Sequence, residues 1–224
     1  MQDRYGSIWL ATPTGCYVIS GGKFTHLKTY DAPAAGLLEI GKDSILISSE
    51  KGTYLMTGSD HKVQLIRRKE IQNADIYCML KHHDQVYFGT GENGIWVWDL
   101  KKNSFKNITT KNGLYSNTIY GLIADPQGNI WTGTGRGINK FKYVFPGDTI
   151  KVSGAEYSNR MVLECNQNAM YLYGNKLWVG TTKGALAFDL TSGVAKKEKP
   201  HIVLQNVKWF SSRVKEGTEY FSKA

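Results

Sequence analysis

Asp125-Pro126-Gln127-Gly128-Asn129-Ile130-Trp131-Thr132-Gly133-Thr134 is the stretch of this sequence that decides the fold. It predicts a tight turn between two β-strands, because Asp125 can accept hydrogen bonds from turn amides, Pro126 fixes φ and Gly128 can adopt a positive φ. After the turn come an apolar residue, an aromatic residue and a small residue before Thr134, and Gly137 opens the next strand. The stretch therefore predicts one hairpin of an antiparallel sheet.

The same order of residue types occurs five times along the chain. Each copy has a large residue in the middle of a strand, a small residue followed by Thr or Ser, and a glycine six or seven residues after the large one. The large residues are Trp9, Leu46, Tyr87, Trp131 and Trp178, and the glycines are Gly15, Gly52, Gly94, Gly137 and Gly184. Successive glycines are 37, 42, 43 and 47 residues apart. A period of about 40 residues is typical of a four-stranded β-propeller blade.

Two positions of the repeat, the large residue and the small residue, can be explained by how such blades pack. The large residue would fill the layer between adjacent sheets, and a small residue two positions later would let the neighbouring sheet approach closely. The small residues are Ala11, Ser48, Gly89, Gly133 and Gly180. Residues 94–99 and 104–108 read as the third and fourth strands of the third copy, and no stretch of helical length has a 3.6-residue period.

We therefore predict an all-β fold in which residues 1–198 form five four-stranded β-propeller repeats. The chain begins at a turn, so the first repeat should lack its opening strand and the propeller should be incomplete. Unpaired strand edges invite pairing with another chain. We accordingly expect self-association through blade edges or as a sensor dimer.

The composition is that of an ordinary β-rich globular protein. The 224 residues are 41% hydrophobic, and 13 Tyr, 8 Phe and 6 Trp favour strands. The net charge of +9 is spread over short clusters, which indicates solvated loops rather than a nucleic-acid-binding surface. Cys16, Cys78 and Cys165 are far apart in sequence, so we expect buried free thiols and neither a zinc site nor a disulfide framework.

Further motif residues lie on both sides of the stretch Asp125–Thr134. It comprises Asn112-Gly113-Leu114-Tyr115-Ser116-Asn117-Thr118-Ile119-Tyr120 before the turn and Gly137-Ile138-Asn139-Lys140-Phe141 after it. Together these segments resemble the two-component regulator propeller repeat. In the fifth copy, Glu164-Cys165-Asn166-Gln167-Asn168-Ala169 is similar to the Glu-Phe-Asn-x-x-Ala element of that family's closing blade, with Cys165 in place of the usual Phe. Residues 199–224 resemble the start of the immunoglobulin-like triple-tyrosine domain that follows the propeller there.

The resemblance implies a function and a location. Such repeats form the periplasmic sensor region of hybrid two-component histidine kinases, which commonly control polysaccharide-utilisation genes. The chain would then be a non-catalytic, periplasmic sensor fragment without a cofactor, which binds an oligosaccharide and signals to a histidine kinase outside this chain. The N-terminus lacks the apolar core of a secretory signal, and a membrane segment would lie in other parts of the protein. The net positive charge favours an acidic glycan over a neutral one.

Candidate ligand-binding residues follow from the fold, because propellers bind ligands with the loops at one end of the central channel. Arg, Asn and Ser side chains in these loops could bond the hydroxyls or carboxylates of a sugar. The candidates are Ser116, Asn117, Arg136, Asn159, Arg160 and Asn166. A role in turn structure is the competing interpretation for each of them.

Two other classes of function stay open. A protein-interaction propeller would carry a broad apolar patch and no small ligand. A propeller glycosidase or lyase would need carboxylates, Tyr and Arg in one pocket, and a sialidase-like mechanism would need an arginine cluster with a Tyr–Glu pair. The Asp-turn-Gly-x-x-Trp pattern resembles the Asp-boxes of sialidases, but these are structural turns. For metal binding, His82 and His83 are poor candidates, because neighbouring side chains on a hairpin diverge and no third ligand is recognisable.

Overall fold

A computed structural model describes most of the chain in two compact units, Met1–Gly193 and Val194–Ala224. The described residues are 1–27, 30, 32–49, 52–58, 62–142, 152–154, 164–190, 207–208 and 218–219. In the second unit, β19 (Val207–Lys208) pairs antiparallel with β20 (Thr218–Glu219). The rest of the expected immunoglobulin-like segment, 199–224, lies outside the described residues, so that domain stays a prediction.

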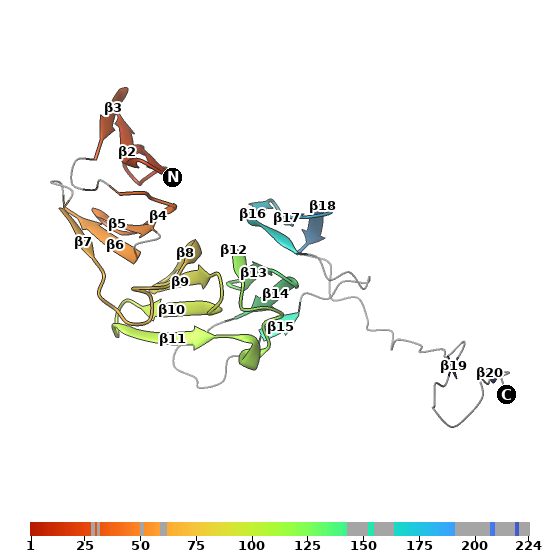
Figure 1. Cartoon of the computed structure of the whole chain (residues 1–224). Coiled ribbons are helices and arrows are strands. Elements are labelled where there is room, and N and C mark those ends of the chain that lie inside the picture. Colours follow the sequence, from red (N-terminus) through yellow and green to blue (C-terminus); the bar gives the residue numbers. More distant parts are fainter. Residues whose placement is uncertain are drawn as a thin grey trace. The chain divides into compact units, whose positions relative to one another are not determined.

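The first unit consists of antiparallel sheets whose strands follow in chain order (Figure 1). The first sheet contains β1 (Ile8–Thr12), β2 (Gly15–Ser20) and β3 (Lys23–His26). The second contains β4 (Gly36–Gly41), β5 (Ser44–Ser49), β6 (Gly52–Thr57) and β7 (Lys62–Leu65), and the third contains β8 (Ile76–His82), β9 (Gln85–Thr90), β10 (Ile95–Asp99) and β11 (Ser104–Ile108). The fourth contains β12 (Ile119–Ala124), β13 (Ile130–Thr134), β14 (Gly137–Phe141) and β15 (Val152–Gly154), and the fifth contains β16 (Cys165–Tyr173), β17 (Lys176–Thr181) and β18 (Gly184–Asp189).

These five sheets confirm the prediction of an all-β array of propeller repeats. Among the described residues, the only helix is the 3₁₀ turn η1 (Thr110–Asn112), and no helix is long and apolar enough to cross a membrane. Three sheets have four described strands, and the first and fifth have three. The described sheets are not closed into a ring, as expected for an incomplete propeller.

The first sheet has only a short substitute for an opening strand. Gln2 forms an isolated antiparallel bridge with Ile8, the amide of Trp9 donates to the Met1 carbonyl at 2.8 Å, and the Met1 ammonium donates to the Trp9 carbonyl at 2.8 Å. Met1 and Gln2 thus pair with β1 at the position that β4, β8, β12 and β16 occupy in the other four sheets.

The sheets pack on one another through their inner strands and through the large-residue column of the repeat. Each large residue packs against residues that flank the large residue of the next sheet. Trp9 clusters with Ile45 and Ile47, Leu46 with Val86 and Phe88, Tyr87 with Ile130, and Trp131 with Leu177 and Val179. The four layers between the five sheets therefore have one common arrangement.

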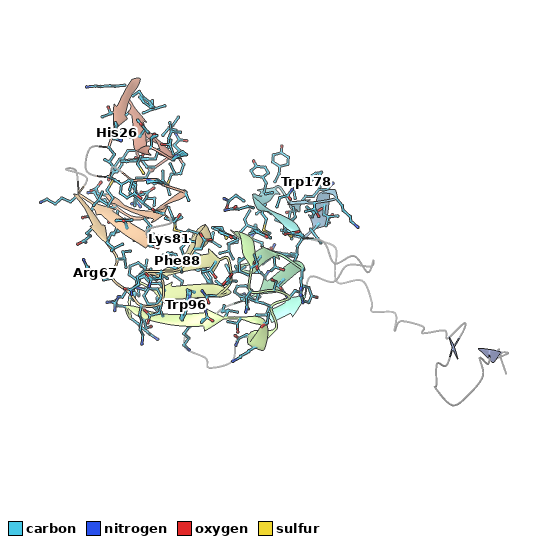
Figure 2. The ribbon with its side chains drawn as sticks, in the orientation of Figure 1. His26, Arg67, Lys81, Phe88, Trp96 and Trp178 are labelled. Atoms are coloured by element: carbon cyan, nitrogen blue, oxygen red, sulfur yellow. The ribbon has the colours of Figure 1, made fainter. Side chains whose placement is uncertain are left out.

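The fifth large residue departs from this arrangement. Trp178 was expected to fill a layer, but its side chain is 43% exposed (Figure 2). The physical reason is that no described sheet follows the fifth one, so nothing described covers the face on which Trp178 lies.

The small-residue column allows the close approach that was predicted for it. A Cβ on Gly89 would lie 2.4 Å from the Sγ of Cys78 and 2.7 Å from Cγ2 of Ile119, which belongs to the next sheet. A Cβ on Gly133 would lie 3.0 Å from the Cβ of Cys165, also in the next sheet. The neighbouring sheets thus pack directly on these glycines.

The acidic turns work as the sequence predicts. Asp125 accepts hydrogen bonds from the backbone amide of Asn129 and from Nε1 of Trp131, both at 2.8 Å. Asp3 accepts from Nε1 of Trp9 at 2.7 Å, with the same six-residue spacing. Each turn is thereby fixed to the tryptophan of its own sheet. The three cysteines are buried free thiols, as expected.

Candidate functional site

Three consecutive inner strands carry a break in pairing register at the same end. The shifts lie between Ile76 and Cys78 in β8, between Ile119 and Gly121 in β12, and between Cys165 and Met170 in β16. In every case the residue before the shift pairs with the Thr that ends the neighbouring strand, so the three positions are equivalent in the repeat. Such bulges re-aim side chains and are frequent beside functional sites.

Two tyrosines occupy the first two of these bulges. The rings of Tyr77 and Tyr120 are parallel within 3°, and their centroids are 5.9 Å apart. The Tyr120 hydroxyl donates to Oε1 of Glu164 at 3.0 Å, and Tyr77 is hydrogen-bonded to Asp75. We call Asp75, Tyr77, Tyr120 and Glu164 the tyrosine cluster. It combines aromatic surface with carboxylate acceptors contributed by three sheets.

The third bulge ties the fifth sheet to the third. Nε2 of Gln167 donates to the backbone carbonyl of Tyr77 at 3.2 Å, although the two residues are 90 positions apart in sequence. Within the same bulge, Asn168 adopts a φ of 54°. On the other side, the Tyr77 ring lies against Gly91, where a Cβ would come within 3.1 Å of its hydroxyl. The position of Tyr77 is therefore fixed from two directions.

The carboxylates around the cluster raise the pKa of both phenols. The charge of Asp75 is the main cause that raises the pKa of Tyr77, and desolvation, the hydrogen bond to Asp75 and the charge of Glu92 add to it. The hydrogen bond to Glu164 is the main cause that raises the pKa of Tyr120. At neutral pH the cluster thus offers apolar ring faces, phenol hydroxyls and carboxylate oxygens. This set suits a ligand rich in hydroxyl groups.

Two of the candidates from the sequence have turn roles at the same end of the sheets. Oγ of Ser116 accepts from the amide of Thr118 at 3.1 Å, and Oδ1 of Asn117 accepts from the amide of Thr110 at 2.9 Å. Both side chains use an acceptor to hold the connection that leads into β12. The competing interpretation, a role in turn structure, therefore applies to both.

The other described candidates are more open to solvent. Arg136 is exposed in the turn between β13 and β14, next to Gly135, where a Cβ would lie 3.9 Å from the Tyr120 ring. Asn166 is exposed in the bulge of β16, and its Nδ2 donates to the carbonyl of Thr181 at 3.2 Å. Asn159 and Arg160 lie outside the described residues.

The sequence reasoning missed Tyr77, Tyr120 and Glu164 as site residues. A usable signal exists, since Ile76-Tyr77 and Ile119-Tyr120 repeat the same pair 43 residues apart, at the start of two successive inner strands. An alignment that included the first strand of each repeat, as well as the residues around the large residue, would have revealed this repeated pair.

A second candidate is an open hollow of about 760 Å³ at the opposite end of the third and fourth sheets. Its carboxylates are already engaged. Asp84 forms a 2.7 Å ion pair with Lys101, Asp99 accepts from the amides of Lys101 and Lys102 at 2.9 Å, and Asp125 holds its own turn. Because none of the described residues that line this hollow is Tyr, Trp or Phe, it lacks the aromatic faces that could stack on a ligand, and we consider the tyrosine cluster the stronger candidate for ligand binding.

The histidine pair in this hollow differs from expectation. The rings of His82 and His83 were expected to diverge, but their centroids are 4.2 Å apart. His83 adopts a φ of 53°, which differs from extended strand geometry and changes the direction of its side chain. Burial lowers the pKa of His82, and the neighbouring His83 lowers it further. No group of three or more His, Cys, Asp or Glu in the described part of the chain could hold a metal ion.

The repeated sheets, the acidic turns and the layered large residues define an open array of β-propeller blades. The family model of the two component regulator propeller matches residues 116–136, which confirms the resemblance inferred from the sequence for that segment. None of the curated proteins matches the chain.

Particular solved structures share the fold. Two structures of the extracellular domain of BT4673 from B. thetaiotaomicron, described once as a one component and once as a hybrid two component system, have a TM-score of 0.66. Their identities are 20% and 18% over 81% of this chain and 24% of that chain. The extracellular domain of the hybrid two component system BT3049 from B. thetaiotaomicron has a TM-score of 0.63 and 18% identity over 85% of this chain and 28% of that chain. The β-propeller domain of Cps50 (Swd1) from Myceliophteria thermophila has a TM-score of 0.60 and 13% identity over 86% and 69%. The chain thus spans about a quarter of the first two structures.

Proposed function

We propose that this chain is a ligand-binding part of the extracellular sensor region of a hybrid two component regulator, and that it signals to a histidine kinase outside this chain. The matched propeller repeat and the fold shared with two extracellular domains of such systems support the proposal. We also propose a periplasmic location, which is supported by the description of both similar structures as extracellular domains.

The proposed ligand is a neutral oligosaccharide bound at the tyrosine cluster. The observation that carries this is the placement of Tyr77 and Tyr120 at equivalent bulges, with Glu164 bonded to Tyr120 at 3.0 Å. Aromatic faces can stack on the C–H groups of a sugar ring, while carboxylates accept from its hydroxyls. The carboxylates of Asp75, Glu92 and Glu164 would repel an acidic sugar. Local charge thus favours a neutral ligand, in contrast to the expectation from the net charge of +9.

Binding without catalysis is the proposed role, although Tyr120 and Glu164 form one part of the sialidase-like set. A carboxylate bonded to a phenol can act as its general base, so catalysis is judged on the remaining residues of that set. Of the described arginines, only Arg136 lies on the third to fifth sheets, whereas an arginine cluster would be needed.

A ligand bound at the tyrosine cluster would produce a signal by bridging three separate sheets. The cluster and the Gln167–Tyr77 hydrogen bond connect the third, fourth and fifth sheets at one end. A ligand that contacts all three would favour one packing of the inner strands over another. Such a difference in affinity is what allows a ligand to shift a two-state receptor.

Isothermal titration calorimetry tests the proposal. The full chain is titrated with neutral xylo-, manno- and malto-oligosaccharides and with acidic oligogalacturonides. We expect binding of at least one neutral series, and binding restricted to the acidic sugars would refute the neutral assignment. No binding of the chain to any of these series would refute the oligosaccharide.

Matched variants locate the site. Tyr120→Phe keeps the ring but removes the hydroxyl bonded to Glu164, and should weaken binding by about tenfold, the value of one hydrogen bond. Tyr120→Ala also removes the stacking surface and should weaken it further. Tyr171→Ala, which removes an exposed tyrosine on β16 outside the cluster, should leave binding unchanged. Equal loss in Tyr171→Ala and Tyr120→Ala would place the ligand elsewhere.

A further inference from the structure

The bulges of β8, β12 and β16 place three residues in equivalent positions of the repeat. The residue before each register shift, which is Ile76, Ile119 or Cys165, pairs with the Thr that ends the neighbouring strand. The residue that follows it is therefore equivalent in the third, fourth and fifth sheets. These following residues, which we call the inner row, are Tyr77, Tyr120 and Asn166.

A repeated backbone hydrogen bond supports this equivalence. In each of the three sheets, the residue after the terminal Thr donates its amide hydrogen to the carbonyl of the residue two positions before the row residue. The three bonds run from Gly91 to Asp75 at 3.0 Å, from Gly135 to Thr118 at 3.1 Å and from Thr182 to Glu164 at 3.0 Å. The bulges thus share one backbone arrangement, and they differ in the side chains that they present.

Each tyrosine of the inner row lies against a glycine of its own sheet. A Cβ on Gly91 would come within 3.1 Å of the Tyr77 hydroxyl, and a Cβ on Gly135 would come within 3.9 Å of the Tyr120 ring. In the fifth sheet a threonine, Thr182, stands in place of the glycine, and the row residue is the smaller asparagine. The row therefore has two aromatic positions followed by one amide position.

The inner row follows the order of the sheets. The rings of Tyr77 and Tyr120 are parallel within 3° with centroids 5.9 Å apart, and the Tyr120 hydroxyl donates to Glu164, two positions before Asn166. Asn166 is exposed, and its one side-chain hydrogen bond with the described residues runs from Nδ2 to the carbonyl of Thr181. Its Oδ1 and its second amide hydrogen can therefore bond a ligand.

We propose that the inner row binds consecutive units of a linear oligosaccharide, and that a ligand needs three units to occupy it. This inference rests on the proposed function, because it defines the ligand of the tyrosine cluster more narrowly. A repeated scaffold presents equivalent side chains at a regular step, which matches the regular step of a sugar polymer. Two units would lie on the rings of Tyr77 and Tyr120, and hydroxyls of the third unit would bond the amide of Asn166.

The dependence of affinity on ligand length tests this inference. The full chain is titrated calorimetrically with xylo-, manno- and malto-oligosaccharides of two, three and four units. In a series that binds, the association constant should rise about tenfold from two to three units, the value of one further hydrogen bond, and change little from three to four. Equal affinity for two and three units would overturn the three-unit row and leave the proposed function standing. Absence of binding at every length would refute both.

Two variants of the fifth sheet locate the third unit. Asn166→Ala should abolish the gain in affinity from two to three units. Combining Asn166→Tyr with Thr182→Gly rebuilds the tyrosine and glycine pair of the third and fourth sheets, and should restore that gain through the new ring. Tyr171→Ala, which removes an exposed tyrosine of β16 outside the row, is the control and should retain the gain.

These variants are compared only after circular dichroism and thermal unfolding have verified that they are folded. A gain that survives in Asn166→Ala would overturn the placement of the third unit. A gain that is lost equally in Tyr171→Ala, or that the rebuilt pair does not restore, would do the same.

Discussion

Replacing Gly89 by Ala tests the layered packing most directly. The new methyl group would lie 2.4 Å from the Sγ of Cys78 and 2.7 Å from Cγ2 of Ile119. Both distances are far below the roughly 3.5–4.0 Å of an optimal contact. Gly89 has no positive φ, so the backbone accepts Ala without strain and the effect is steric. Relief would require the fourth sheet to move, because Ile119 belongs to β12.

The expected cost follows from two opposing effects. Overpacking a close-packed core costs about 1–3 kcal/mol, while replacing Gly by Ala in a compatible conformation stabilises by about 0.4–1 kcal/mol through the unfolded state. With two contacts below 3 Å the steric cost should dominate, and we expect a net loss of about 2 kcal/mol in the free energy of unfolding.

Urea unfolding followed by tryptophan fluorescence and far-UV circular dichroism measures this loss. The midpoint should fall while the slope stays the same, since the surface exposed on unfolding is unchanged. Gly41→Ala is the control, because the nearest atom to its added Cβ would be 3.8 Å away and its φ is not positive. A Gly89→Ala protein as stable as the wild type, or two variants with equal losses, would refute the close-packed layer.

Three further predictions concern the acidic turn and the thiols. Asp125→Ala removes the acceptor of the buried Trp131 indole and should cost about 2–4 kcal/mol in urea unfolding. Asp84→Ala breaks only an exposed ion pair and should leave the unfolding midpoint nearly unchanged, so similar losses in the two variants would contradict the structural role of the turn. Burial raises the pKa of Asp125, but hydrogen bonds from Trp131 and Asn129 outweigh it and leave the pKa below the ordinary 3.8. The ionised Asp125 carboxylate should therefore contribute its full stabilisation above the unfolded pKa, and lose it as the pH falls through the lower folded pKa. An Asp125→Asn protein whose stability has the same acid dependence as the wild type would disprove this prediction. Burial raises the pKa of Cys78 to about 12. A thiol reagent at neutral pH should therefore modify Cys78 no faster than the protein unfolds. Rapid modification of the native protein would show that the layer between the third and fourth sheets is open to solvent.

The sequence was sufficient for the architecture because the repeat columns have direct physical roles. The acceptor role of Asp125, the close packing on Gly89 and the strands at 95–99 and 104–108 all follow from residue type and spacing. Each is set by local geometry or by one neighbouring sheet, so the pattern of a single repeat determines it.

The tyrosine cluster could not be predicted in the same way. It depends on shifts of the pairing register that fall at the same position in three different strands. Tyr120 meets both Tyr77 and Glu164 only because β8 and β12 each bulge by one residue at the same position. The residue types around the large residue of each repeat do not encode that bulge. The exposure of Trp178 was also missed, since it depends on what lies beyond the fifth sheet and not on the residue itself.

The common arrangement of the layers has a consequence for how the molecule opens. Each sheet of the first unit packs chiefly on the sheets before and after it, so unfolding should behave as a nearest-neighbour process. Amides in the first and fifth sheets should exchange with solvent before those of the third sheet, whose Tyr87 and Phe88 are covered from both sides. A ligand held by the tyrosine cluster would then protect the terminal fifth sheet most, because that sheet has the most stability to gain.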